Sequence, residues 1–226
     1  MAEPFIEMPD LINKVIHGDC LGVMKQIPDK SIDLILTDPP YGIGESLGKN
    51  QSRSNRGIPA KDYGYLDWDK EIPSKEVFQE MFRISKKQII FGGNYFVEFL
   101  HNSPCWIVWD KDNGINDFAD CELIWTSYNS AVRKITYRWN GMLQENMKEK
   151  EKRYHPTQKP VGLIKRILTM YAKKGWIVAD FFAGSGSILV AAEELGYQWI
   201  GVEKEKDYCA IAEKRIKEAQ SQGMLL

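Results

Sequence analysis

The 226-residue chain lacks several features that would define a class of protein. It has three histidines and four scattered cysteines, with no Cys-x-x-Cys pair and no histidine at metal-ligand spacing. This argues against a disulfide framework or a zinc site and favours reduced thiols. No apolar run approaches the roughly 18 residues of a membrane span, and the acidic, proline-broken start "MAEPFIEMPD" does not resemble a signal peptide. We therefore expect a soluble cytoplasmic protein that needs neither a membrane nor a metal.

The chain also lacks an excess of positive or negative charge, because its formal net charge is −1. No global field therefore indicates a nucleic-acid partner, and any basic surface must be local.

What the chain does contain is an alternation of short apolar runs with helical patterns, which is typical of a mostly parallel sheet. With 43% hydrophobic residues it can bury a sizeable core. We predict one α/β domain over residues 1–226, with a doubly wound, Rossmann-like sheet. The predicted strands are 14–19, 31–37, 88–93, 105–111, 122–128, 131–139, 176–182 and 198–204. The predicted helices are a short one ending near 26, then 74–85 with Ser74 as a cap, 94–100, 160–174, 187–196 and 207–220.

Two stretches depart from this alternation. Residues 44–64 are polar, rich in glycine and serine, and carry Arg53 and Arg56. Residues 140–155 form a run of mixed charge. The simplest interpretation of both is a solvated or mobile loop.

The strand predicted at 31–37 runs into "DPPYG", residues 38–42. Proline fixes φ, has no N–H, and forces the residue before it into an extended conformation. Asp38 is therefore held rigidly, and the carbonyls of Asp38 and Pro39 lack local partners, while Tyr41 offers a flat apolar face. Such a cluster of acceptors suits an exocyclic –NH2 on a planar ring. A plain turn is the alternative.

A second motif, "DFFAGSGS" at 180–187, lies between a predicted strand and a predicted helix. Gly184 and Gly186 allow a tight turn and close approach of a ligand to the helix N-terminus. Leu189 stands where a dinucleotide fingerprint has its third glycine. Glu203, at the end of the next strand, is placed to accept hydrogen bonds from a ribose diol. The pair predicts a nucleoside-bearing cofactor without a pyrophosphate; a mere strand–helix turn or a nicotinamide dehydrogenase are the alternatives.

Two shorter motifs are weaker alone. "HGD" at 17–19 puts Asp19 at a strand exit, where Gly-Asp is a common turn. "HPTQKP" at 155–160 precedes a helix and offers Thr157 and Lys159 as donors. Its simpler interpretation is a helix cap with an exposed lysine.

Together, "DPPYG", "FAGSGS", "HPTQKP" and "GVEK" resemble the S-adenosylmethionine-dependent amino-methyltransferases of DNA. Because the acceptor motif precedes the cofactor motif, the chain looks like the circularly permuted β-group, with a recognition segment between the two. The resemblance covers the chain from about Lys14 to Lys217.

The resemblance implies roles for particular residues. The target base would be flipped out of double-stranded DNA and held by Asp38, Pro39, Pro40 and Tyr41. Asp19 would meet the adenine amino group of the cofactor, Glu203 its ribose, and Thr157, Lys159 and Ser187 its carboxylate. The glycine-rich turn around its methionine part would comprise Asp180, Phe181, Ala183, Gly184 and Gly186. Phe181 replaces a usual proline, and Ser187 a usual threonine.

In this family Asp-Pro-Pro-Tyr is more usual for methylation of adenine N6, and Ser-Pro-Pro-Tyr for cytosine N4. The resemblance therefore implies an adenine-N6 enzyme, with cytosine N4 as the alternative. Rival interpretations are an RNA or protein amino-methyltransferase and a DNA-binding module without activity. Since the intact motifs and their order favour DNA methylation, we expect the protein in a bacterial or phage-infected cell, near the nucleoid.

Contact with DNA needs local cations. The expected contributors are the loop 44–64, through Arg53 and Arg56, and a recognition insertion at 112–154, through Arg133, Lys134 and Arg138. Lys134 and Arg138 fit the solvated face of an edge strand equally well. Because the insertion is short, we expect either a short target site or a homodimer that supplies more surface.

Overall fold

The computed structural model describes residues 8–43, 71–114, 119–140, 143–154 and 157–223. The predicted loop 44–64, with Arg53 and Arg56, lies outside these residues.

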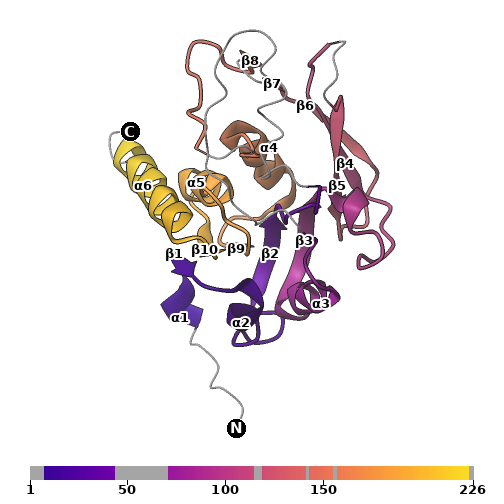
Figure 1. The fold of residues 1–226 in the computed structure, drawn as a ribbon, viewed down its shortest axis with the longest axis vertical. Helices are drawn as coiled ribbons and strands as arrows, with labels where there is room; N and C mark the ends of the chain where they lie inside the picture. Colours follow the sequence, from indigo (N-terminus) through magenta and orange to yellow (C-terminus); the bar gives the residue numbers. More distant parts are fainter. Residues whose placement is uncertain (1–7, 44–70, 115–118, 141–142, 155–156, 224–226) are drawn as a thin grey trace.

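The described residues form an α/β fold in which strands and helices alternate for most of the chain (Figure 1). The helices are α1 (Met8–Leu11), α2 (Cys20–Met24), α3 (Lys75–Ile84), the 3-10 helix η1 (Gly93–Tyr95), α4 (Val161–Tyr171), α5 (Ser187–Glu194) and α6 (Lys206–Gly223). The strands are β1 (Lys14–His17), β2 (Ile32–Thr37), β3 (Ser85–Phe91), β4 (Trp106–Asp110), β5 (Cys121–Thr126), β6 (Arg133–Thr136), β7 (Trp139–Asn140), β8 (Leu143–Gln144), β9 (Ile177–Asp180) and β10 (Gln198–Glu203).

Eight strands form one sheet in the order β1-β10-β9-β2-β3-β5-β4-β6. The pairs from β1 to β3 are all parallel, β5 is antiparallel to both of its neighbours, and β6 is parallel to β4. The prediction of a doubly wound, mostly parallel sheet is confirmed. Because β1, β10, β9 and β2 are parallel and adjacent, their carboxyl ends meet at one edge, where ligands of such sheets bind.

Alternating side chains of the strands give the sheet two covered faces. Leu34 and Leu36 of β2 join a core with residues of α4, α5 and α6, whereas Ile35 joins a second core with α2 and α3. All three are fully buried, and burying one such side chain stabilises the fold by about 1.5–3 kcal/mol. The near-continuous apolar run of β2 is therefore explained by burial on both faces.

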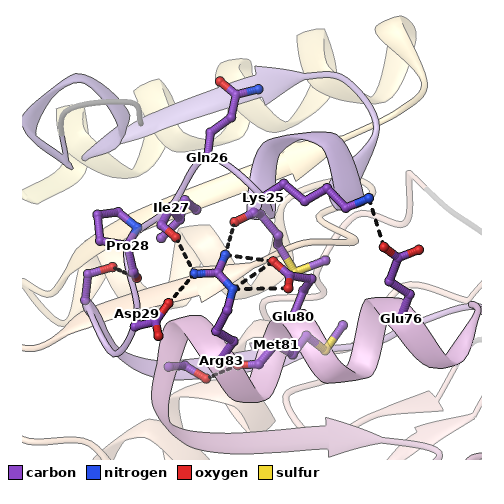
Figure 2. A network of polar contacts seen from close by, with 12 residues as sticks. Lys25, Gln26, Ile27, Pro28, Asp29, Glu76, Glu80, Met81 and Arg83 are labelled. Carbon is purple, nitrogen blue, oxygen red and sulfur yellow. Dashed lines mark hydrogen bonds and ion pairs between the residues drawn. The ribbon is translucent and has the colours of Figure 1, made fainter. Parts of the chain in front are cut away.

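Arg83 of α3 ties that helix to the turn after α2 (Figure 2). Its guanidinium donates to the carbonyls of Met24 and Ile27, at 2.9 Å each, and to the carboxylates of Asp29 and Glu80. The planar fork of arginine suits this set of acceptors better than a lysine would. These hydrogen bonds and ion pairs of Arg83 hold α2 and α3 together in the layer below the sheet.

Two predictions from the sequence differ from the structure: one helix and one helix cap. The helix predicted at 94–100 is wrong: only the short η1 forms, because Tyr95 stacks on Tyr41 and Phe96 is buried in the core. Ser74 precedes α3 in an extended conformation, but its side chain makes no capping hydrogen bond.

Part of the segment predicted as a recognition insertion, 112–154, belongs to the main sheet. β5 and β6 belong to the main sheet, and β7 and β8 form a small second sheet.

Among the described residues, no helix has the length and apolar content needed to cross a membrane.

Candidate active site

A cavity of about 720 Å³ opens at the edge where the parallel strands end. It gathers motifs from five segments of the chain. Four of them meet because the registers of β1, β10, β9 and β2 align their carboxyl ends, and the fifth precedes α4. Predicted site residues that line it are Asp19, Asp38, Pro40, Thr157, Lys159, Asp180, Phe181, Ala183, Gly184, Ser187 and Glu203. Pro39, Tyr41 and Gly186 adjoin lining residues in the chain but do not line the cavity themselves.

The glycine-rich turn joins β9 to α5 at the floor of this cavity. Gly184 has φ +50° and Gly186 φ +79°, a backbone conformation that favours glycine. A Cβ on Gly186 would lie 2.7 Å from Cβ of Ala212 in α6, whereas a Cβ on Gly184 would meet no atom of the described residues within 4 Å. Gly186 is therefore required for packing, and Gly184 leaves space on the cavity side.

Leu189, at the position of the missing third glycine, packs against the neighbouring strand. A Cβ on Gly201 of β10 would lie 2.3 Å from Cδ1 of Leu189. The close approach of helix and strand, which the third glycine of a dinucleotide motif provides, is provided here by a glycine on the strand.

Glu203 ends β10 with both carboxylate oxygens bound to backbone. Oε2 accepts from the N–H of Gly184 at 2.6 Å, and Oε1 from the N–H of Glu205 at 2.8 Å. Burial raises the pKa of Glu203 against these hydrogen bonds. Glu203 lines the cavity, and its carboxylate has the capacity to accept from a ligand hydroxyl in addition to these donors. Asp19 likewise lines the cavity while it caps α2, accepting from the N–H of Gly22 at 3.0 Å.

Asp180, at the end of β9, is a buried carboxyl held in place by two donors. Its Oδ1 accepts from Oγ1 of Thr37 at 2.7 Å and from the N–H of Phe182 at 3.1 Å. Burial, with the nearby charges of Asp38 and Glu203, raises its pKa to about 7 in spite of these hydrogen bonds.

Asp38 leaves β2 at the rim of the cavity, and both of its oxygens have partners. Oδ1 accepts from the Tyr41 hydroxyl at 2.6 Å, and Oδ2 lies 2.9 Å from Nζ of Lys159. Burial raises the pKa of Asp38, and Lys159 opposes the rise. The prolines between Asp38 and Tyr41 thus hold an acceptor and an aromatic ring beside each other, as the sequence predicts for a pocket rather than a plain turn.

Tyr41 already has an aromatic neighbour. The Tyr95 ring of η1 stacks on it, with centroids 4.7 Å apart and an interplanar angle of 14°, and 42% of Tyr95 is exposed. Gly92 makes room for Tyr41, because a Cβ there would lie 2.3 Å from the ring. The sequence motifs do not include Tyr95 or Gly92, and only their place at the end of the strand predicted at 88–93 and just beyond it could have indicated them.

Lys159 is buried, so the simpler expectation of an exposed lysine after "HPTQ" is wrong. Its ammonium group contacts Asp38 and, at 3.3 Å, Oε2 of Glu122, and donates to the Tyr41 hydroxyl at 3.2 Å. It therefore lines the cavity and contacts two side chains of the Asp-Pro-Pro-Tyr segment. Sequence reasoning missed Glu122 because a single acid in a predicted strand carries no signal of its own.

Comparison with known proteins gives the family. The family model described as DNA methylase, for N6 and N4 methyltransferases, matches residues 32–214. That is more than half of the chain. The chain belongs to this family.

Its relatives and structural neighbours agree. The type II methyltransferase M.HinfI of Haemophilus influenzae is 27% identical over 254 residues, covering 92% of this chain and 69% of its own. The M1.HpyAVI–SAM complex has a TM-score of 0.57 at 21% identity, covering 90% of this chain and 98% of that one. The PvuII DNA methyltransferase, which is cytosine-N4-specific, has a TM-score of 0.58 at 16% identity, covering 92% and 90%. These likenesses show the Rossmann-like fold of DNA methyltransferases.

The structure of this DNA methyltransferase describes three of the cations that the sequence predicts to contact DNA. Two of them are paired within the chain. Lys134 lies 2.7 Å from Asp110, and Arg138 pairs with Asp112. Arg133, the third, is exposed on β6. No group of three or more His, Cys, Asp or Glu side chains placed to hold a metal ion occurs in the described part of the chain.

Proposed function

We propose that this DNA methyltransferase transfers a methyl group from S-adenosylmethionine to N6 of adenine in double-stranded DNA. The observation that carries the proposal is Asp38, held at the rim of a cavity lined by the glycine-rich turn and paired with Tyr41 and Lys159. A duplex base cannot reach this position, so the target nucleotide must be flipped out.

The residues around the cavity fit a cofactor that combines a nucleoside with an amino acid. Glu203 is placed for ribose hydroxyls, Asp19 for the adenine amino group, and Gly184 leaves room for close approach of the methionine part. Thr157 and Ser187 line the cavity and would hold the cofactor carboxylate through their hydroxyls, and the N-terminus of α5, which begins at Ser187, favours an anion. Bound there, S-adenosylmethionine supplies an electrophilic methyl group on a sulfonium centre.

The chain's own residues act on the target amine. An exocyclic amine is a weak nucleophile because its lone pair is delocalised into the ring. A hydrogen bond to the Asp38 carboxylate and another to the Pro39 carbonyl favour the pyramidal nitrogen, whose lone pair is then available for attack. This is positioning and electrostatic stabilisation by preorganised acceptors.

Tyr41 provides the flat face for the flipped base, and Tyr95 lies against that ring in this structure. A base stacked on the same face therefore displaces Tyr95. Because Tyr95 is half-exposed on the short η1, its movement disturbs little of the core. Stacking of a base on an aromatic side chain contributes about 1–3 kcal/mol.

Asp-Pro-Pro-Tyr favours adenine, and cytosine N4 is the second candidate because its exocyclic amine meets the same acceptors and a structural neighbour has that specificity. The test is to express the protein in a host without DNA methylation and to digest its DNA to nucleosides. We expect N6-methyladenine by mass spectrometry; N4-methylcytosine as the sole product would contradict the assignment.

Asp38→Ala tests the site itself. We expect the transfer rate to fall at least about 100-fold, because an acceptor made for the transition state is lost, while cofactor affinity measured by calorimetry stays within about threefold. Glu76→Ala, which removes an exposed carboxylate of α3, is the control and should match the wild type. Turnover near normal in the Asp38 variant would remove Asp38 from the mechanism.

The DNA-facing surface and assembly belong to the same proposal. We place the duplex along the side of the sheet that carries β6, with Arg133, Lys134 and Arg138, and we place the enzyme in the bacterial cytoplasm. A homodimer would extend a surface that is short in one chain.

A further inference from the structure

Four charged side chains of alternating sign form a row that begins at Asp38 and leads away from the cavity. Lys159 contacts Asp38 at 2.9 Å and Glu122 at 3.3 Å, and Glu122 contacts Lys111 at 2.7 Å through its other oxygen. These groups come from β5, from the residues just after β4 and from the segment before α4. Neither Glu122 nor Lys111 lines the cavity.

The pairing of Lys159 with Glu122 is not needed to satisfy Asp38. Side chains of Lys159, Asp38, Glu122 and Lys111 are only 7%, 18%, 20% and 18% exposed, so their charges interact with little screening by water. Buried charges destabilise the fold unless they are paired. A site that needed only one counter-ion for Asp38 would be complete with Lys159, yet the chain buries a second acid and a second base beside it.

The second acid has a consequence for the proton affinity of Asp38. Lys159 alone would make Asp38 a weaker proton acceptor, because its positive charge stabilises the carboxylate. Glu122 adds a negative charge near Asp38 and shares the ammonium group of Lys159 as an ion pair, which opposes the effect of Lys159 on the basicity of Asp38. Lys111, bound to Glu122, moderates that effect in turn.

Proton acceptance matters in the reaction proposed above, on which this inference rests. The target nitrogen forms a bond to the methyl carbon as the carbon–sulfur bond breaks, and the electron pair goes to sulfur. The nitrogen is then cationic and must lose one proton, which passes to the Asp38 carboxylate and from there to water. We propose that Glu122 and Lys111 are positioning residues that set the basicity of Asp38 through Lys159.

Other groups facing Asp38 are the Tyr41 hydroxyl and the Asp180 carboxyl of β9. The directions of the pKa shifts agree with the proposed coupling. Burial raises the pKa of Asp38, Lys159 lowers it, and Glu122 raises it again. Burial opposes the charge of Glu122, but Lys159 and Lys111 outweigh it and hold the pKa of that carboxyl below its usual value.

The test is the pH dependence of methyl transfer in two single variants, Glu122→Gln and Lys111→Met. Single-turnover incorporation of tritiated methyl groups into plasmid DNA is followed with saturating cofactor, whichever base accepts the methyl group. Since transfer requires ionised Asp38, its rate rises with pH through the Asp38 pKa. Glu122→Gln should move this acidic limb to lower pH by at least about half a unit, and Lys111→Met should move it to higher pH.

Matched controls are Glu76→Gln and Lys86→Met, which remove the same charges from exposed ion pairs on α3 and β3. Glu122→Asp should return the limb toward the wild-type position. A merely structural role would not give shifts of opposite sign in the two variants. Shifts of the same sign, or none beyond the controls, overturn the proposal.

If Glu122→Gln does not fold, as judged by circular dichroism, Lys111→Met decides, and an unmoved limb overturns the inference. Transfer that persists in Asp38→Ala would instead overturn the assignment of Asp38. The two failures are therefore distinguishable.

Discussion

Carboxyl groups of three strand ends, Asp38, Asp180 and Glu203, converge on one cavity, and burial raises the pKa of each. Such a concentration of buried acids works against folding, since each loses hydration. It is typical of a site that binds a ligand with positive charge and several donors. These three carboxyl groups therefore lower the stability of the fold and favour the binding of a ligand.

Asp180→Asn measures that loss of stability. The wild-type pKa is about 7 in the folded protein against an ordinary 3.8. A raised pKa means that the native state keeps the proton, so the contribution of Asp180 to the free energy of unfolding is most favourable below pH 4 and is lost as pH rises through 7. Three units correspond to about 4 kcal/mol.

Asparagine keeps the acceptor for Thr37 and Phe182 and cannot ionise. We therefore expect urea denaturation to show the stability of the variant, relative to wild type, rising by about 3 kcal/mol between pH 4.5 and 8. Parallel stability curves for the two proteins would contradict the buried, protonated state of Asp180.

Among the elements, the turn between β9 and α5 shows how one short segment serves both folding and binding. Its two glycines share positive φ but differ in surroundings, since Gly186 abuts α6 and Gly184 faces open space. Arg215 of α6 holds the same turn from behind, donating to the Ser185 carbonyl at 2.6 Å and to the Ser187 hydroxyl at 3.2 Å. The long C-terminal helix thus helps to position the glycine-rich turn.

Alanine at each glycine should separate the two functions. Gly186→Ala adds overpacking against Ala212 to backbone strain, about 3 kcal/mol in total, and should lower Tm by about 6–12 °C. Gly184→Ala adds only strain, about 1–2 kcal/mol, yet should weaken cofactor binding at least about tenfold, because its methyl group enters the cavity. Thermal melts and calorimetry give both values. Unchanged cofactor affinity in Gly184→Ala would mean that the cofactor does not approach this turn.

For the whole molecule, charge has to be arranged locally, because the net charge is only −1. Acidic neighbours on β4 and just beyond it partly cancel the cations of β6 and of Arg138. If these cations contact DNA, as proposed, DNA must compete with their internal partners. Binding that depends on such exchange is sensitive to salt.

Asp112→Asn removes the ion pair of Arg138 but keeps its hydrogen bond to the backbone carbonyl of residue 112, and asparagine tolerates the positive φ of 46° at this position. If this surface faces DNA, affinity should rise about threefold or more, and the slope of log K against log salt should steepen by up to about 0.9. Glu76→Gln makes the same net-charge change at a pair on α3 and serves as the control. Equal effects in both variants, measured by fluorescence anisotropy, would show a response to net charge alone.

Local sequence determined much of the result: the strand exits, the glycine turn, the parallel order of the sheet and the motifs that assign the family. These features follow from backbone restrictions of proline and glycine and from apolar patterning, which act over a few residues. The helix predicted at 94–100 failed for the complementary reason. Its aromatic side chains gain more from contacts with Tyr41 and the core than a short helix gains from its own hydrogen bonds.

Only the tertiary structure decided what surrounds the Asp-Pro-Pro-Tyr motif. Tyr95 on the Tyr41 ring, Glu122 and Lys111 behind Lys159, and Arg215 beneath the glycine turn are each brought in from a distant element. A lone acid, lysine or tyrosine carries no pattern that marks its partner, since electrostatic and stacking contacts depend on distance in space and not on separation along the chain. The sequence therefore specified the motifs, and the packing of the sheet specified their environment.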